Sequence, residues 1–248
     1  MTHPNQNLKM LNVSQDVTLY SFPKCGRTWL RYIFMYLFNE HLAAEHKILP
    51  EHAKKKKIIL IRDIRDVLVS YYFELTKREG FGAIDPNEKE KLAKKWQKSD
   101  QTLSALIHIG TIDTFMKFYK TCYKTKGEKL LMRYEALHQD TYTEILRMTR
   151  FLNRDAQESN IREAIEKASF QNMRKMEASG SGIPGIQHMG TWLPNLTPKD
   201  PGDTDTYKTR SGKVGGYEEH LSETDIEFVN KQIRKKYRQL LSVYGYEA

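Results

Sequence analysis

The sequence predicts one α/β domain in which a central parallel sheet is flanked by helices on both faces, a doubly wound arrangement. Val17–Phe22 alternates apolar and polar side chains like a short buried strand, and apolar residues at helical spacing follow it. Ile58–Ile61 is a short, fully apolar run of the kind found in central parallel strands. A chain of 248 residues, 39% of them hydrophobic, is long enough to form one such domain with a substantial core.

The first predicted strand leads into the loop Tyr20–Trp29. A strand–loop–helix connection directs backbone N–H groups and the positive end of a helix dipole to one point, where a phosphate can bind. Gly26 allows close backbone approach, and Lys24 and Arg27 add positive charge. A basic turn without a ligand is the alternative interpretation. Ordinary ATP or GTP hydrolysis is disfavoured, because the lysine precedes the glycine and no Lys-Ser/Thr pair follows it.

The second predicted strand ends at Arg62. Open α/β sheets bind ligands beyond the carboxyl ends of their strands, and the planar guanidinium group suits phosphate oxygens. Asp63 is placed to cap the next helix. Ser70 lies on that helix, eight residues beyond Arg62, and by itself is an ordinary surface serine.

The remaining pattern predicts further helices, a third strand and two irregular stretches. We expect helices over about residues 28–40, 142–152, 157–168 and 222–241, and an amphipathic helix through Ile112, Phe115, Met116 and Tyr119. Lys129–Glu135 is expected to be a strand running into a turn, and residues 77–100 a loop followed by a surface helix. Residues 177–209 lack periodicity and are expected to form a lid loop, and residues 1–15 a flexible N-terminus.

Composition restricts the partners and the compartment. The net charge of +9 favours anionic partners, either a nucleotide or nucleic acid. The run Lys54–Lys57 is expected to be a solvated loop, because no nucleic-acid motif accompanies it. Two cysteines and the lack of a long apolar run indicate a cytoplasmic protein with no membrane partner.

Several segments, in order along the chain, resemble the motifs of the cytosolic-type sulfotransferases that use 3′-phosphoadenosine-5′-phosphosulfate (PAPS). Pro23–Trp29 is similar to the 5′-phosphosulfate loop Pro-Lys-Ser-Gly-Thr-Thr-Trp, with Cys25 and Arg27 replacing a serine and a threonine. Arg62–Tyr72 is similar to the 3′-phosphate motif Arg-Asn-Pro-x-Asp-x-x-x-Ser-x-Tyr, although Asp63-Ile64 replaces Asn-Pro. The chain is similar to a short bacterial-type member of this family.

Three later segments extend the resemblance. Tyr134–Leu137 is similar to Tyr-Glu-Asp-Leu, whose tyrosine faces adenine, and Ser169–Met173 to Ser-Phe-x-x-Met, whose aromatic ring stacks on adenine. Arg210–Tyr217 is similar to Arg-Lys-Gly-x-x-Gly-Asp-Trp, with Ser211 replacing the lysine. The family's C-terminal dimerisation motif is not recognisable after Tyr217, so the oligomeric state stays open.

The resemblance implies a P-loop-like fold and the function of a PAPS-dependent sulfotransferase. It implies in-line transfer of a sulfuryl group to a hydroxyl or amine of a small-molecule acceptor, with 3′,5′-ADP as product and no metal. Lys24 would stabilise the leaving oxygen. The implied nucleotide contacts are Lys24, Cys25, Gly26, Arg27, Thr28, Trp29, Arg62, Ser70, Tyr134, Phe170, Arg210, Ser211 and Gly212.

The resemblance also implies a histidine base between the first helix and the strand ending at Arg62. His41, His46 and His52 are the candidates, and their spacing matches no common metal motif. His46 is preferred, because the apolar segment after it can direct it towards the cleft. His41 is the alternative and is expected at the end of the first helix, and His52 is expected to be solvated.

Three further interpretations stay open. A nucleotide-dependent phosphotransferase would require a metal, and a basic nucleic-acid-binding module would show strongly salt-dependent binding. Cys25 lies in an electropositive loop at a helix N-terminus, so its thiol pKa is expected to be lowered, with a buried inert cysteine as the alternative.

Overall fold

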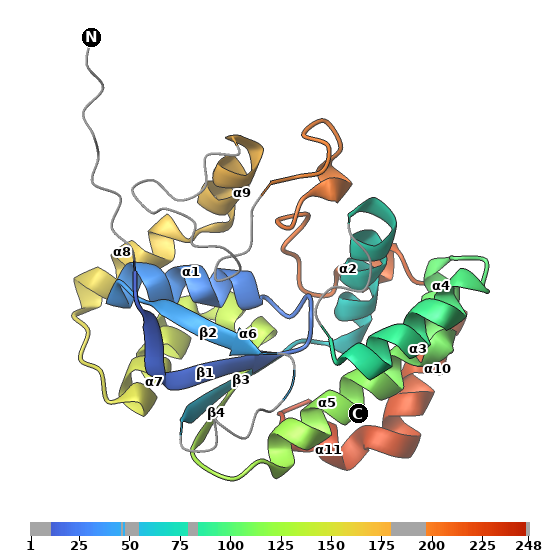
Figure 1. Cartoon of the computed structure of the whole chain (residues 1–248), viewed down its shortest axis with the longest axis horizontal. Coiled ribbons are helices and arrows are strands. Elements are labelled where there is room, and N and C mark those ends of the chain that lie inside the picture. Colours follow the sequence, from blue (N-terminus) through green and yellow to red (C-terminus); the bar gives the residue numbers. More distant parts are fainter. Residues whose placement is uncertain (1–10, 46, 48–54, 79–83, 180–196, 247–248) are drawn as a thin grey trace.

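The computed structural model describes residues 11–45, 47, 55–78, 84–179 and 197–246. Within these residues the centre is a four-stranded parallel sheet with strand order β2-β1-β3-β4. The strands are β1 (Val13–Ser21), β2 (His41–Glu45), β3 (Lys56–Ile61) and β4 (Lys129–Arg133). Helices lie on both faces (Figure 1), which confirms the predicted fold class.

Some of the described helices precede strand β4 in the sequence, and the others follow it. The first group contains α1 (Arg27–Phe38), α2 (Ile64–Lys77), α3 (Pro86–Gln97), α4 (Leu103–Leu106), the π-helical turn η2 (Ile107–Thr111) and α5 (Ile112–Lys124). The second group contains α6 (Tyr134–Gln139), α7 (Thr141–Leu152), α8 (Glu158–Lys167), α9 (Phe170–Ser179), the 3₁₀ turns η3 (Thr204–Thr206) and η4 (Gly216–Glu219), α10 (Glu223–Gln232), the π-helical turn η5 (Ile233–Tyr237) and α11 (Arg238–Val243).

Both faces of the sheet are buried, as the apolar strands predict. Side chains alternate across β3, so Ile59 and Ile61 join a core with α2, α3, α5 and α10. Ile58 and Leu60 join a second core with α1, α7 and α8. The helix after β1 and the helix after β3 therefore cover opposite faces of the sheet.

The register aligns the carboxyl ends of the strands. Ser21 of β1 pairs with Leu60 of β3, and Ile61 at the end of β3 pairs with Arg133 of β4. The chain segments that leave these strands therefore start from one edge of the sheet. Asp63 caps α2 by accepting a hydrogen bond from the Arg65 backbone N–H at 2.8 Å, as predicted.

Four local expectations are wrong. The first helix ends at Phe38, and His41 begins strand β2 instead of ending the helix, because Asn39 closes the helix with a φ of 55°. β1 begins at Val13, within the stretch expected to be flexible. Lys57 lies buried in β3 rather than in a solvated loop. Residues 177–179 belong to α9 rather than to the expected lid loop.

Candidate nucleotide-binding site

A cavity of about 940 Å³ lies at the carboxyl ends of β1 and β3. Because α1 and α2 leave these neighbouring strands towards opposite faces, this is the position where doubly wound sheets bind ligands. Of the thirteen predicted nucleotide contacts, only Cys25 is absent from the cavity lining. The others line it: Lys24, Gly26, Arg27, Thr28, Trp29, Arg62, Ser70, Tyr134, Phe170, Arg210, Ser211 and Gly212.

The loop between β1 and α1 has an unusual backbone. Both Lys24 (φ 70°) and Gly26 (φ 88°) adopt left-handed conformations. A Cβ atom at Gly26 would lie 2.5 Å from Cδ2 of Tyr134, so this position requires glycine on two grounds. Lys24 turns its ammonium towards α2, where Nζ lies 2.8 Å from Oε2 of Glu74.

Cys25 lies on the inner side of the same loop and is fully buried. Its Sγ accepts a hydrogen bond from the Tyr119 hydroxyl at 3.4 Å. Burial raises the pKa of the Cys25 thiol to about 12, because the thiolate would lose its hydration. The expectation of a lowered thiol pKa is therefore wrong, and the alternative of a buried cysteine describes the structure.

Arg62 connects three segments at the edge of the cavity. Its guanidinium donates to the carbonyl oxygens of Lys213 at 2.7 Å and of Lys24 at 3.3 Å. It also stacks on the Tyr134 ring, 4.3 Å from the ring centroid. These contacts fix the positive charge of Arg62 between the loop after β1 and the loop that contains Arg210–Gly212.

Asp66 holds that second loop in place. Its carboxylate accepts hydrogen bonds from the backbone N–H groups of Gly215 at 2.9 Å and Tyr217 at 3.0 Å, and it lies 3.4 Å from the Arg62 guanidinium. Asp66 matched the sequence motif, but its bonding role depends on residues about 150 positions away and has no local signal. Ser70 lies one turn further along α2 and also lines the cavity.

Aromatic rings form the other wall of the cavity. The Phe170 ring is 43% exposed and covers Gly212, where a Cβ would lie 2.9 Å from the ring. The Tyr134 hydroxyl donates to the Gly212 carbonyl at 3.1 Å. Trp29 lies edge-on to Tyr134 with ring centroids 6.0 Å apart. His138, which belongs to none of the sequence motifs, lies beside both rings and lines the cavity.

Arg210 adds a further positive charge to the lining of the cavity. Its guanidinium stacks on the Phe73 ring at 4.0 Å and lies 3.8 Å from Asp205. Ser211 occupies the place of the motif's lysine, and Lys213, two residues later, also lines the cavity. The loop therefore carries a second cation, Lys213, close in sequence to the position where this chain lacks the lysine of the motif.

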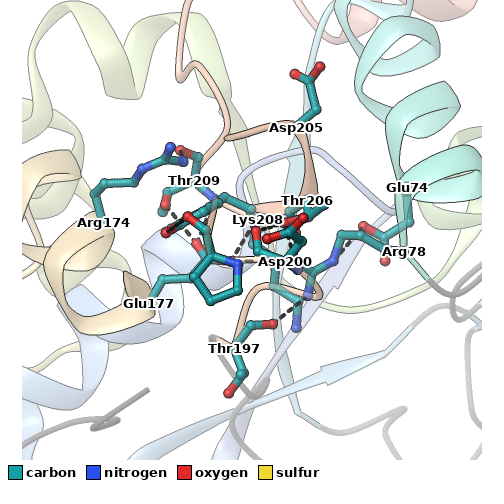
Figure 2. A network of polar contacts seen from close by, with 12 residues as sticks. Glu74, Arg78, Arg174, Glu177, Thr197, Asp200, Asp205, Thr206, Lys208 and Thr209 are labelled. Atoms are coloured by element: carbon teal, nitrogen blue, oxygen red, sulfur yellow. Dashed lines mark hydrogen bonds and ion pairs between the residues drawn. The ribbon is translucent and has the colours of Figure 1, made fainter. Parts of the chain in front are cut away.

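A group of charged residues outside all the motifs supports this side of the cavity (Figure 2). Glu177, fully buried at the end of α9, accepts hydrogen bonds from the backbone N–H groups of Lys208 at 2.6 Å and Thr209 at 2.9 Å. Arg78 lies 3.5 Å from Glu177 and 3.6 Å from Glu74. These contacts join α2, α9 and the segment before Arg210, and sequence periodicity gives no sign of them.

The candidate histidine bases fall in different places. His41 starts β2 opposite Val13, at the amino end of the sheet, whereas the cavity lies at the carboxyl end. This placement is unfavourable for His41 as a base. His46 and His52 lie outside the described residues. Glu45, the residue before His46, pairs with Tyr20 near the end of β1, on the cavity side.

The described residues contain no candidate membrane span and no candidate metal site. No helix among them is long and apolar enough to cross a membrane. In the same part of the chain, no group of three or more His, Cys, Asp or Glu residues is arranged to hold a metal ion.

Residues 36–240 match the family model described as the sulfotransferase domain. The chain therefore belongs to the sulfotransferase family. Its sequence is 23% identical to cytosolic sulfotransferase 9 of Arabidopsis thaliana over 207 residues, which cover 79% of this chain and 54% of the relative. It is 25% identical to cytosolic sulfotransferase 12 of the same plant over 209 residues, covering 82% of this chain and 56% of the relative. The chain thus spans about half the length of these curated relatives.

Solved structures share the fold at low sequence identity. The crystal structure of mouse sulfotransferase SULT7A1 complexed with PAP superposes with a TM-score of 0.63 at 14% identity, covering 94% of this chain and 90% of that one. Retinol dehydratase in complex with retinol and PAP gives a TM-score of 0.63 at 13% identity, covering 92% and 82%.

Proposed function

We propose that this protein is a PAPS-dependent sulfotransferase. It transfers a sulfuryl group to a hydroxyl or amine of a small-molecule acceptor, with 3′,5′-ADP (PAP) as the second product. The observation that carries the proposal is that one cavity is lined by residues whose nucleotide contacts the family resemblance implies: Lys24, Arg62, Ser70, Tyr134, Phe170 and Arg210. Membership of the sulfotransferase family and the PAP complexes of its structural neighbours support the same nucleotide.

The residues present fit an adenine nucleotide with two phosphate-bearing ends. Phe170 offers a half-exposed ring for base stacking. Gly26 and Gly212 leave room for the rings of Tyr134 and Phe170, which a Cβ at these positions would meet at 2.5 Å and 2.9 Å. Nε of Arg62 and Nε1 of Trp29 are buried and have no hydrogen-bond partner among the described residues. These donors and the cations around them suit phosphate oxygens.

When bound, PAPS supplies the activated sulfuryl group. Lys24 holds a proton at Nζ and stabilises negative charge on the oxygen that leaves with the 5′-phosphate. Arg62, Ser70 and Arg210 bind the 3′-phosphate, and Tyr134 and Phe170 orient the adenine. Chemistry of this kind depends on placement and charge stabilisation more than on covalent catalysis.

We assign the general base to His46, with His41 and His52 as the alternatives. Glu45 ends β2 and pairs with Tyr20, at the edge of the sheet that carries the cavity, and His46 is the next residue in the sequence. The distant placement of His41 in β2 supports this order of preference. An ordinary histidine pKa near 6.5 suits base catalysis at neutral pH.

We also propose that the chain forms one sulfotransferase domain over residues 1–248. Of the lid loop expected over residues 177–209, residues 180–196 lie outside the described residues. A cytoplasmic location agrees with the cytosolic relatives. Nucleic acid and membranes are not expected as partners.

The test measures nucleotide binding and transfer separately, in buffer with EDTA. Isothermal titration should show tighter binding of PAP than of 5′-AMP, and radiolabelled PAPS should label acceptors in a panel of phenols, alcohols, amines, steroids and sugars. Magnesium-dependent transfer from ATP would instead support a phosphotransferase. Tight, salt-dependent binding of DNA or RNA without PAP binding would support a nucleic-acid-binding module.

A further inference from the structure

The ammonium of Lys24 is paired with a carboxylate that belongs to none of the sequence motifs. Nζ lies 2.8 Å from Oε2 of Glu74, and the two side chains are only 15% and 16% exposed. Glu74 lies on α2 one turn beyond Ser70, and Lys24, Ser70 and Glu74 all line the nucleotide cavity. The reacting end of this cavity therefore contains a fixed negative charge as well as a positive one.

Glu74 faces several cations. Nε of Arg78 lies 3.6 Å from the same Oε2 atom of Glu74. Lys208 approaches from the segment before Arg210, lines the cavity, and interacts electrostatically with Glu74 and Lys24. Glu177 of α9 faces the group from the other side and lies 3.5 Å from Arg78 (Figure 2). Arg27 of the loop after β1 also interacts electrostatically with Glu74. Among the described residues, two carboxylates, Glu74 and Glu177, thus face four cations.

This arrangement governs which groups carry a proton. Burial lowers the pKa of Lys24, because an ammonium loses its hydration, and the neighbouring Glu74 opposes this shift. Burial alone would raise the pKa of Glu74, but Lys24, Arg78 and Lys208 hold it below its ordinary value. Burial, followed by the charge of Arg78, lowers the pKa of Lys208 to about 8. Glu74 therefore stays ionised where its lysine neighbours are prone to lose their protons.

We propose that Glu74 is a positioning residue that keeps Lys24 in the ammonium form and holds it at the phosphate loop. The assignment rests on the proposed function, in which Lys24 stabilises the leaving oxygen. A neutral amine at Nζ would donate a weaker hydrogen bond to a developing negative charge than an ammonium does. Without Glu74, Lys24 would share a buried site with Arg78 and Lys208, and Glu177 would be the carboxylate that still acts on both lysines among the described residues.

The first test is the pH dependence of turnover at saturating PAPS. Glu74→Gln keeps the shape of the side chain but removes its charge, so the basic limb of the profile should move to lower pH by about one unit or more. Glu74→Asp keeps the charge and should hold the limb near its wild-type position. The double variant Glu74→Gln with Lys208→Met removes one cation together with the carboxylate and should move the limb back towards wild type. Glu90→Gln is the matched control, because Glu90 forms an exposed ion pair with Lys94 at 2.6 Å on α3.

The second test reads the protonation of Lys24 without any transfer reaction. Acetic anhydride reacts with neutral amines, so the acetylation rate of Lys24 at several pH values, followed by mass spectrometry, gives its pKa. Glu74→Gln should acetylate faster at Lys24 than wild type at the same pH, and Glu90→Gln should not. If both the basic limb and the acetylation profile of Glu74→Gln equal those of wild type, the assignment of Glu74 is wrong. If Lys24 titrates as expected but wild type transfers no sulfuryl group to any acceptor, the proposed function fails and the role of Glu74 in protonation stands.

Discussion

Replacing Arg62 by alanine is expected to weaken binding of PAP far more than binding of 5′-AMP, which lacks the 3′-phosphate. The guanidinium is already held by two carbonyl oxygens and the Tyr134 ring, so a phosphate meets a charge that is fixed in place. A hydrogen bond to a charged group contributes about 1.5–3 kcal/mol. Because about 1.4 kcal/mol equals a factor of ten, the loss for PAP should lie between about tenfold and a little over a hundredfold.

Isothermal titration of both nucleotides at one ionic strength checks this prediction. Arg65→Ala is the control, because Arg65 is the next arginine in the sequence, in the first turn of α2, but it is absent from the cavity lining. It pairs with Asp63 and stacks on the Tyr217 ring at 4.4 Å. Arg65→Ala should leave the ratio of the two affinities unchanged. Ser70→Ala removes a neutral donor and should weaken PAP by about twofold to tenfold. Equal losses of PAP and 5′-AMP in Arg62→Ala would mean that Arg62 only holds the two loops together, and the reasoning would be refuted.

Four other outcomes are expected. Lys24→Ala should lower turnover about a hundredfold or more while changing PAP affinity much less, and turnover within about threefold of wild type would contradict its role. Gly26→Ala should lower the thermal midpoint of unfolding more than Gly215→Ala. Both glycines have positive φ, but of the two only a Cβ at Gly26 would meet a ring, that of Tyr134 at 2.5 Å. Equal decreases in the midpoint would exclude an effect of that clash. Iodoacetamide at pH 8 should label Cys25 no faster than buried Cys122 in the folded protein, because burial raises the pKa of both thiols to about 12; mass spectrometry of the two peptides decides this. His46→Ala should lower turnover about a hundredfold or more and retain PAP affinity. His41→Ala should lower the stability of the protein, because His41 is buried. If only His41→Ala lost turnover, the assignment of the base to His46 would be wrong.

Local sequence patterns predicted the parts of the fold that depend on neighbouring residues. The alternation in β1, the apolar run of β3 and the cap at Asp63 each involve residues close in sequence. The cavity lining also followed, because the motifs are short segments that carry their own glycines and cations.

The features that the sequence did not reveal depend on distant contacts. β2 contains Leu42-Ala43-Ala44 between polar residues, a weak strand pattern that becomes a strand only by pairing with β1. Cys25 lies in a sequence segment rich in positive charge, but its thiol is fully buried and accepts a hydrogen bond from the hydroxyl of Tyr119, 94 residues later. Glu74 pairs with Lys24 across 50 residues, and Glu177 reaches Thr209 across 32. No periodicity links such pairs, so only the folded chain reveals them.

The distance along the chain between the two sides of the cavity also affects how the protein folds. Arg62 bonds to Lys213, and Asp66 to Tyr217, each across 151 residues. Contacts of such high sequence separation form slowly, because a long loop must close before they contribute. During synthesis, β1, β3 and α2 leave the ribosome long before the segment that completes the cavity. The nucleotide pocket is therefore expected to form among the last parts of the native structure, and any ligand it binds stabilises the finished fold by mass action rather than guiding its early steps.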